Sequence, residues 1–281
     1  MPLAALLLVV GAAACHSAWN LVFKSETHRE QVSLGALIVG AIMASPVLFV
    51  YPLRDVSLQG WTLIALSGVF ETAYVVALTA AYRAGDLSLV YPIARGIPAL
   101  VVVPLSIVLL GERLSLSGLA GIALVVVGIF GTRQSGGPAS HAPRAIVLAG
   151  LTGLTISAYS LVNKLGVQQV PVPLYAMLVF AVDAALLAVV LKARGTLGWP
   201  PMPRARWRPA LVVGVLMMGA YLGVLGALAR APLAYVVAGR EVSIVMTTVA
   251  GTVLLGERAS ARRIGGAALI FAGLVMIALS R

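Results

Sequence analysis

Two arginines stand inside apolar segments of this chain. Arg95 and Arg240 each lie about eight residues, or roughly 12 Å of helix, into an apolar run. An arginine within a bilayer costs at least about 2.5 kcal/mol on insertion scales, so it usually faces a polar cavity or a partner. Its guanidinium binds carboxylates and phosphates through two parallel N–H donors. The two residues predict a site for an anionic group. The alternatives are a structural ion pair, or a side chain that extends to the nearer membrane surface.

Three carboxylates also lie in apolar runs. Glu71 stands near the middle of its run, and because loss of water favours the neutral form of a carboxylate, it is a candidate carrier of a coupling proton. The alternative is a fixed partner for one of the arginines, which we favour for Asp183. Glu241 directly follows Arg240, but adjacent residues point about 100° apart on a helix, so the two need not pair. Glu241 is therefore also a candidate substrate ligand.

The first apolar run carries His16, Trp19 and Asn20 on roughly one helical face. Histidine titrates near neutral pH, so His16 is a candidate for substrate binding or for carrying a proton. The alternative is a hydrogen bond between helices. Trp19, Tyr74 and Tyr91 are candidates for the lining of a binding cavity, and the alternative for each is packing or anchoring at the membrane interface.

Composition sets the class of protein. The chain has 281 residues, of which 60% are hydrophobic and 10% are charged, whereas soluble domains have about 25% charged residues. This predicts an integral membrane protein that crosses the bilayer several times. The net charge of +11 comes mostly from short links between apolar runs, which favours orientation in an anionic membrane over nucleic-acid binding. The single cysteine, Cys15, excludes an intramolecular disulfide and a cysteine metal site.

The apolar runs number ten, and a span needs about 20 residues. They cover approximately residues 3–23, 32–51, 58–82, 87–110, 116–130, 145–162, 172–191, 209–229, 233–255 and 264–279. The expected fold is therefore all-α, with ten transmembrane helices.

The chain contains an internal repeat. The sequence Val-Leu-Leu-Gly-Glu-Arg occurs at 108–113 and again at 253–258, and the same offset of 145 residues relates Arg95 to Arg240. Identical residues in a fixed register indicate a duplication. We expect a first repeat at 1–132, a flexible Gly-, Ser- and Pro-rich link at 133–144 and a second repeat at 145–281. Because each repeat has an odd number of spans, the two must be inserted in opposite orientations, as in many secondary transporters.

Local signals complete the pattern. Pro92, Pro98 and Pro104 should kink or break the fourth span, and interrupted helices often build transporter sites. The two Gly-Glu-Arg sequences read as structural stops, with Gly ending the helix and Glu-Arg at the surface. Ser115 and Ser260 can then cap the next helices.

These features resemble the drug/metabolite transporter superfamily, in particular the EamA-type transporters. The resemblance covers nearly the whole chain. It rests on a fourth helix of each half that ends in Leu-Gly-Glu (residues 110–112 and 255–257) and on a glycine-rich fifth helix in each half. The first span also looks like the opening helix of the small multidrug exporters. No acid surrounds His16, however, which puts cation antiport of their kind in doubt.

Together these features predict a secondary transporter of a small polar or amphipathic metabolite, an amino acid or organic anion, that works by alternating access in the cell (inner) membrane. Export is expected from the resemblance, and Glu71 and His16 are the candidates for carrying a coupling proton. The alternatives are a flippase of the same fold for a lipid-linked substrate and, less favoured, a membrane-embedded enzyme. No nucleotide-binding motif and only three histidines are present, so we expect no cofactor, no metal and no enzymatic activity. The expected state is a monomer or a weak homo-oligomer.

Overall fold

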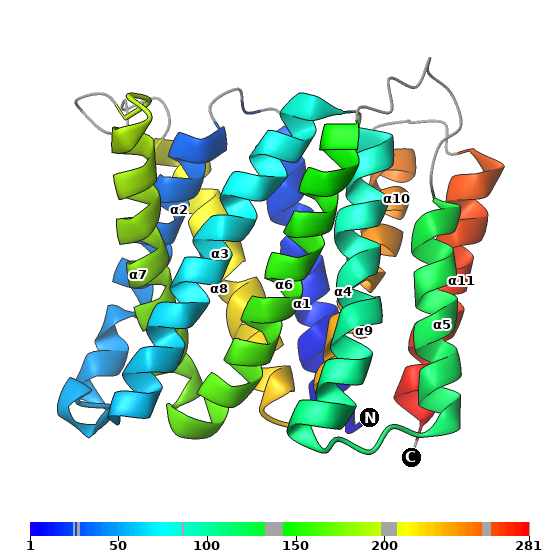
Figure 1. Cartoon of the computed structure of the whole chain (residues 1–281), viewed down its shortest axis with the longest axis horizontal. Helices are drawn as coiled ribbons and strands as arrows, with labels where there is room; N and C mark the ends of the chain where they lie inside the picture. The colour runs from blue at the N-terminus through cyan, green and yellow to red at the C-terminus, as the bar shows by residue number, and fades with distance from the viewer. Residues whose placement is uncertain are drawn as a thin grey trace.

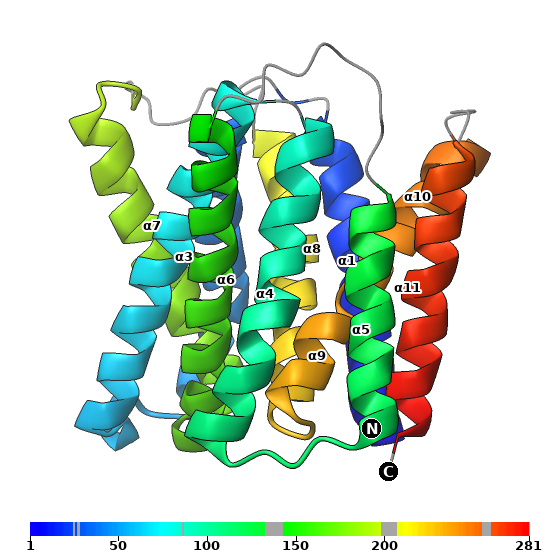
Figure 2. The same ribbon diagram turned by 45° about the vertical axis from the view of Figure 1, so that its right-hand side comes forward.

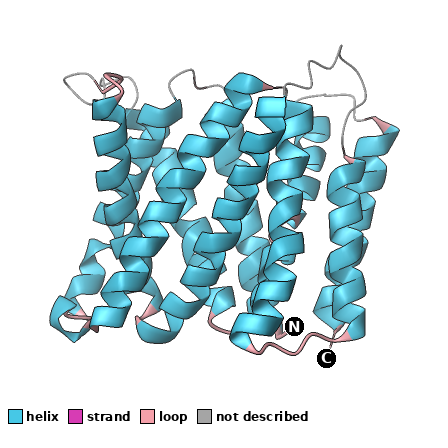
Figure 3. Ribbon diagram, viewed as in Figure 1, coloured by secondary structure: helices cyan, strands magenta, loops and turns pink. Residues whose placement is uncertain are grey.

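A computed structural model shows an all-helical protein, and it describes residues 1–24, 26, 29–85, 87–132, 143–197, 207–254 and 260–280. The helices of the first half are α1 (Leu3–Lys24), α2 (Arg29–Ala44), α3 (Leu58–Ala84), α4 (Leu87–Leu110) and α5 (Leu116–Gly131), with 3₁₀ turns at Ser45–Phe49 (η1) and Leu53–Asp55 (η2). Those of the second half are α6 (Pro143–Gln169), α7 (Val172–Ala193), α8 (Trp207–Leu228), α9 (Leu233–Gly239), α10 (Val242–Leu254) and α11 (Ala261–Leu279). The helices stand roughly parallel to one another, and in the view of Figure 1 α8 lies behind α3 and α1 lies behind α6 (Figures 1 and 3).

The helices match the predicted spans. In the described part of the chain, eight are long and apolar enough to cross a membrane. Helix α5 is shorter, with 16 residues, and α9 and α10 together occupy the ninth predicted span. The expected all-helical fold of ten spans is confirmed. Of the predicted link 133–144, only Pro143 and Arg144 are described, as the start of α6, and the second Gly-Glu-Arg sequence lies outside the described residues.

The two halves pack as inverted copies of each other. Helix α3 packs on α6, and its counterpart α8 packs on α1; α4 packs on α6, as α9 and α10 pack on α1. Helices α2 and α7, and α5 and α11, pack directly on their own counterparts. In Figure 1, α1 and α6 run in opposite directions, and both termini lie at the same end of the helices. We call this end the termini face.

Glycines bring α5 and α11 into backbone contact. A Cβ on Gly121 would lie 2.7 Å from the carbonyl oxygen of Gly273, and one on Gly128 would lie 2.7 Å from that of Gly266. The repeat offset relates Gly121 to Gly266 and Gly128 to Gly273, so each contact is the symmetry mate of the other. Small residues let membrane helices approach closely, and here they bring one helix of each half into contact.

The ninth predicted span is interrupted, although the sequence analysis expected the interruption in the fourth. Helix α4 continues as one helix although Pro92, Pro98 and Pro104 lie inside it, so the prolines do not divide it. The ninth span is interrupted instead, between Gly239 and Val242. At this junction the N–H of Glu241 bonds to the carbonyl of Ala238, three residues back. The bonds tighten from i−4 to i−3, a pattern that often marks a functional hinge.

The first Gly-Glu-Arg sequence is only partly as expected. Gly111 has a positive φ of 63° and follows the end of α4, Arg113 is exposed, and Ser115 accepts the N–H of Gly118 as the cap of α5. The expectation that Glu112 lies free at the surface is wrong. Its side chain is 11% exposed and forms an ion pair with Lys164, because the link between α4 and α5 lies against the second half.

We predict that two adjacent glycines of α11 respond oppositely to alanine. A Cβ on Gly266 would lie 2.6 Å from the carbonyl oxygen of Gly128, so Gly266→Ala should destabilise the protein by about 1–3 kcal/mol through overpacking. Nothing lies within 4 Å of a Cβ on Gly265, so Gly265→Ala should gain up to about 1 kcal/mol of helix propensity. Unfolding of both variants in detergent measures the difference, and equal effects would contradict the backbone contact.

Candidate functional site

The two halves meet in a buried ion pair. Nε of Arg95, on α4, lies 3.0 Å from Oε2 of Glu241, at the junction of α9 and α10, and both side chains are less than 10% exposed. Nη2 of Arg95 also lies 3.5 Å from Oγ of Ser243, and the hydroxyl of Ser17 on α1 donates to the carbonyl of Ser243 at 3.0 Å. A buried charge is tolerated when it is paired and hydrogen-bonded. The ion pair considered for Arg95 is therefore present, and it joins α4 to the junction that interrupts the ninth span.

The second arginine lacks the equivalent partner. The offset of 145 residues relates Glu241 to Gly96, so the symmetry mate of the Arg95–Glu241 pair would join Arg240 to position 96. A glycine stands there, packed against the ring of Phe130. Arg240 donates to the hydroxyl of Tyr159 at 3.4 Å and forms no ion pair with a carboxylate of the described residues. We call Arg95, Glu241, Ser243, Arg240 and Tyr159 the arginine cluster. Because it contains two arginines and one carboxylate, it holds one excess positive charge.

Tyrosines from three helices surround the arginines. Tyr91 precedes Arg95 by one turn of α4 and lies beside it. The ring of Tyr74, on α3, packs edge-on against that of Tyr159, on α6, with centroids 5.9 Å apart. The structure thus brings Tyr74 and Tyr91 to the arginine cluster, and their role as substrate ligands stays a prediction.

The candidates on α1 are arranged differently. Both arginines act electrostatically on the ring of His16, which also stacks edge-on with Trp19 at 4.8 Å. Trp19 packs against the apolar contact between α2 and α8. The amide of Asn20 donates to the carbonyl of His16 at 2.7 Å, a bond within the same helix. Of these three residues, we connect His16 to the arginine cluster, because both arginines act on its ring.

Glu71 lies in a second polar group, made of Ser67, Glu71, Asn163, Tyr175 and Tyr221. We call it the Glu71 cluster. Oε1 of Glu71 accepts hydrogen bonds from the hydroxyl of Tyr221 at 2.7 Å and from the amide of Asn163 at 3.2 Å. The amide oxygen of Asn163 in turn accepts from the hydroxyls of Ser67 at 2.6 Å and Tyr175 at 3.0 Å. Because Ser67 and Glu71 lie on α3 and the others on α6, α7 and α8, this cluster also joins the halves.

The alternative that Glu71 and Asp183 are fixed partners of the arginines is wrong for the described residues. Neither Glu71 nor Asp183 forms an ion pair with an arginine that the structure describes. Asp183, on α7, is buried and accepts a hydrogen bond from the hydroxyl of Thr72 at 2.6 Å. The two acids are held by hydroxyl and amide groups, so neither charge is cancelled by a salt bridge in the described residues.

Sequence reasoning missed several members of both groups: Ser243, Asn163, Tyr175 and Tyr221. Asn163 offered a usable signal, because it is an amide next to Lys164 in a repeat-related apolar span. Tyr175 and Tyr221 offered none, since tyrosines in apolar spans are common as packing residues.

Comparisons with known proteins identify the architecture. The model of the EamA-like transporter family matches residues 3–134 and again residues 143–279. A protein of known crystal structure superposes with a TM-score of 0.81 over 99% of this chain and 98% of its own, at 18% sequence identity. At that identity the likeness shows the fold alone. No curated protein matches the sequence.

We predict that the Arg95–Glu241 pair is strongly coupled. Glu241→Gln leaves the Arg95 charge buried without a carboxylate and should cost about 3–5 kcal/mol of stability. Arg95→Met should cost a similar amount, because it leaves the Glu241 carboxylate buried without its arginine. The double variant should lose less than the sum of the two. Unfolding in detergent measures this cycle, with Arg113→Met at an exposed site as the matched control, expected within about 0.5 kcal/mol of the parent. Additive losses would contradict the pairing.

Proposed function

The chain belongs to the EamA-like transporter family, and from this premise we propose that it carries a small organic anion or amino acid across the membrane by alternating access. It is a multi-pass membrane transporter and not an enzyme. The moving units in this proposal are the repeats at 1–132 and 145–281, joined by the link 133–144. The cell (inner) membrane as its location, export as its direction and a monomeric or weakly oligomeric state remain predictions.

The observation that carries the proposal is the excess charge of Arg240. Arg95 and Glu241 neutralise each other, whereas the glycine at position 96 leaves Arg240 without the corresponding carboxylate. An arginine guanidinium favours a carboxylate or phosphate as its partner. A substrate anion would supply the negative charge that the first half lacks. The neighbouring tyrosines, Tyr74, Tyr91 and Tyr159, offer aromatic surface and hydroxyl groups to the rest of the molecule.

This assignment refines the roles of the predicted ligands. Arg240 is the residue that binds the anionic group, and Arg95 with Glu241 keeps the surrounding charge balanced. Tyr74, Tyr91 and His16 complete the site from α3, α4 and α1. Trp19 and Asn20 support it through α1, since Trp19 stacks on His16 and Asn20 bonds to the His16 carbonyl.

We predict that an anionic ligand stabilises the purified protein and that Arg240→Ala removes this effect. A charge-assisted hydrogen bond contributes about 1.5–3 kcal/mol, so the apparent affinity should fall about tenfold or more. The measurement is thermal unfolding in detergent against amino acids, organic and phosphorylated anions, and organic cations.

Arg230→Ala is the matched control, because Arg230 is an exposed arginine of the same half. It should keep the full stabilisation by the anion. Stabilisation by organic cations alone, or an equal loss in both variants, would overturn the anion site.

We also assign the coupling proton to Glu71. Glu71 is held by hydroxyl and amide groups and forms no ion pair among the described residues, so its ionisation would reduce the net positive charge that favours an anion. A neutral Glu71 restores that charge. Proton and anion should therefore bind together, and export of the anion would have to be driven by exchange or by its own gradient. His16 is the second candidate for carrying the proton.

We predict that ligand stabilisation weakens as pH rises, because ionisation of Glu71 places a negative charge near the bound anion. Glu71→Gln keeps the size of the side chain and its ability to form hydrogen bonds, but it cannot ionise. Stabilisation of this variant by the anion should therefore stay high at every pH. Thermal shifts with a stabilising anion, recorded over a pH series, test this. Persistence of the pH dependence in Glu71→Gln and its loss in His16→Gln would transfer the role to His16.

A further inference from the structure

The link between α4 and α5 is bound to the second half at the termini face. In Figure 2 the link passes beneath the start of α9. The two carboxylate oxygens of Glu112 accept the N–H of Leu233 at 2.9 and 2.8 Å. Leu233 is the first residue of α9, whose initial N–H groups have no partner within the helix. A side chain of the first half thus caps a helix of the second.

Lys164 completes this contact from α6. Its Nζ lies 3.5 Å from Oε1 of Glu112 and donates to the carbonyls of Leu228 at 2.7 Å and Ala231 at 2.8 Å. Only 11% of the Glu112 side chain and 12% of the Lys164 side chain are exposed. We call Glu112, Lys164 and the residues they bind the termini-face contact. It holds the end of α6, the end of α8 and the start of α9 to the link of the other half.

Tyr235, on α9, packs against the start of α5 beside the termini-face contact. The hydroxyl of Tyr235 accepts the N–H of Ser115 at 2.9 Å. Its ring lies against Gly118, where any Cβ would clash. Helix α9 has only seven residues and ends at the junction that carries Arg240. Glu112 therefore fixes one end of the short helix whose other end bears the anion-binding residue.

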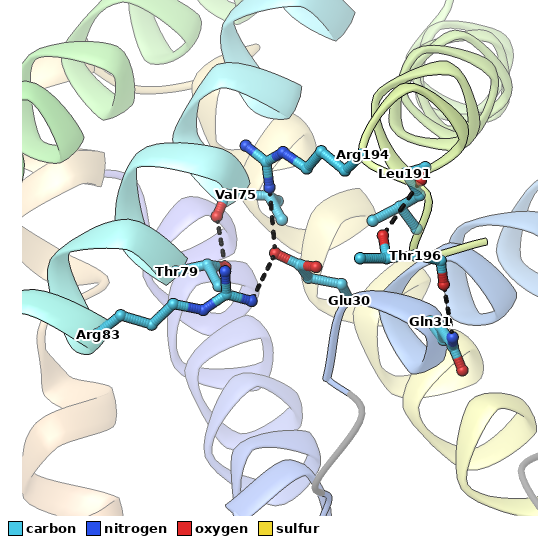
Figure 4. Close-up of polar contacts among 8 residues, drawn as sticks. All are labelled: Glu30, Gln31, Val75, Thr79, Arg83, Leu191, Arg194 and Thr196. Carbon is cyan, nitrogen blue, oxygen red and sulfur yellow. Dashed lines mark hydrogen bonds and ion pairs between the residues drawn. The ribbon is translucent and has the colours of Figure 1, made fainter.

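At the opposite face, an ion-pair group that also joins the halves is more exposed. There Glu30 pairs with Arg83 at 3.5 Å and with Arg194 at 3.4 Å, so it also joins the halves (Figure 4). The arginine side chains are 70% and 38% exposed. Exposed pairs contribute about 0–1 kcal/mol, whereas the termini-face contact is desolvated and has backbone partners.

We propose that Glu112 and Lys164 are positioning residues that close the termini face, and that this contact must break for the site at Arg240 to open to that face. The inference rests on the proposed alternating access. It does not depend on which substrate is carried, because it concerns only the contacts between α9 and the first half.

The test uses two cysteine reporters in the full chain, with Cys15→Ser removing the one native thiol. Ala231→Cys lies within the contact, and Ala238→Cys lies near the other end of α9; both alanines are buried. Ala238 follows Tyr235 by three residues and so shares the face of α9 that meets α5. A water-soluble maleimide reports the exposure of each position in detergent.

With Glu112→Gln we expect the labelling rate of both reporters to rise about tenfold, which corresponds to ~1.4 kcal/mol of lost closure. A rise at Ala231→Cys alone would mean that the link loosens while the termini face stays closed, and this result would overturn the proposal. No rise at either position would overturn it as well. Lys164→Met breaks the contact from the second half and serves if Glu112→Gln does not fold; the same results are expected of it.

Glu257→Gln is the matched control, since the repeat relates Glu257 to Glu112. It should leave both labelling rates unchanged, and an equal rise would overturn the assignment to the termini face. Labelling needs no ligand. The experiment can therefore fail while the anion site holds, or succeed while Arg240→Ala leaves ligand binding intact.

Discussion

A charge inside the bilayer must find a partner, and in this protein that partner comes from the other half. The Arg95–Glu241 pair joins α4 to the junction of α9 and α10. A chain with these residues cannot leave the halves apart without exposing two charges to hydrocarbon, at a cost of several kcal/mol for each. The pair therefore sets how the halves meet. It also places the tightened turn of the ninth span, and with it Arg240, at the contact between them.

The inverted symmetry is kept where packing requires it and broken where charge is needed. At α5 and α11 each glycine contact has its mate, because close backbone approach tolerates no larger side chain on either helix. In the arginine cluster the repeat keeps both arginines but only one carboxylate, with Gly96 in place of the second. A fully symmetric cluster would be neutral. The missing carboxylate leaves a protein that packs as two equal halves with a net charge between them.

Much of the fold was predictable from the sequence, because spans, repeat offset and inverted orientation follow from hydrophobic length and counting. The site was predictable only in part. The sequence marked Arg95, Arg240 and Glu71, since charged residues stand out in apolar runs. It did not show that Glu241 pairs with Arg95, because that choice depends on how helices from different halves face each other. Three prolines suggested a kink or a break in α4, yet α4 continues as one helix past all three. Glu112 looked like a surface residue because its partners lie 52 and 121 residues further along the chain.

In the proposed mechanism, helix α9 connects substrate binding to the closure of one face. A helix of seven residues is too short to be stable alone, so its position depends on what binds its ends. Glu112 binds the N–H at its start, and Arg240 stands at its end beside the pair that joins the halves. An anion bound to Arg240 would act on α9, the same short helix whose start is bound by Glu112. In this mechanism substrate binding and closure of the termini face both act on α9, so each would change the free energy of the other.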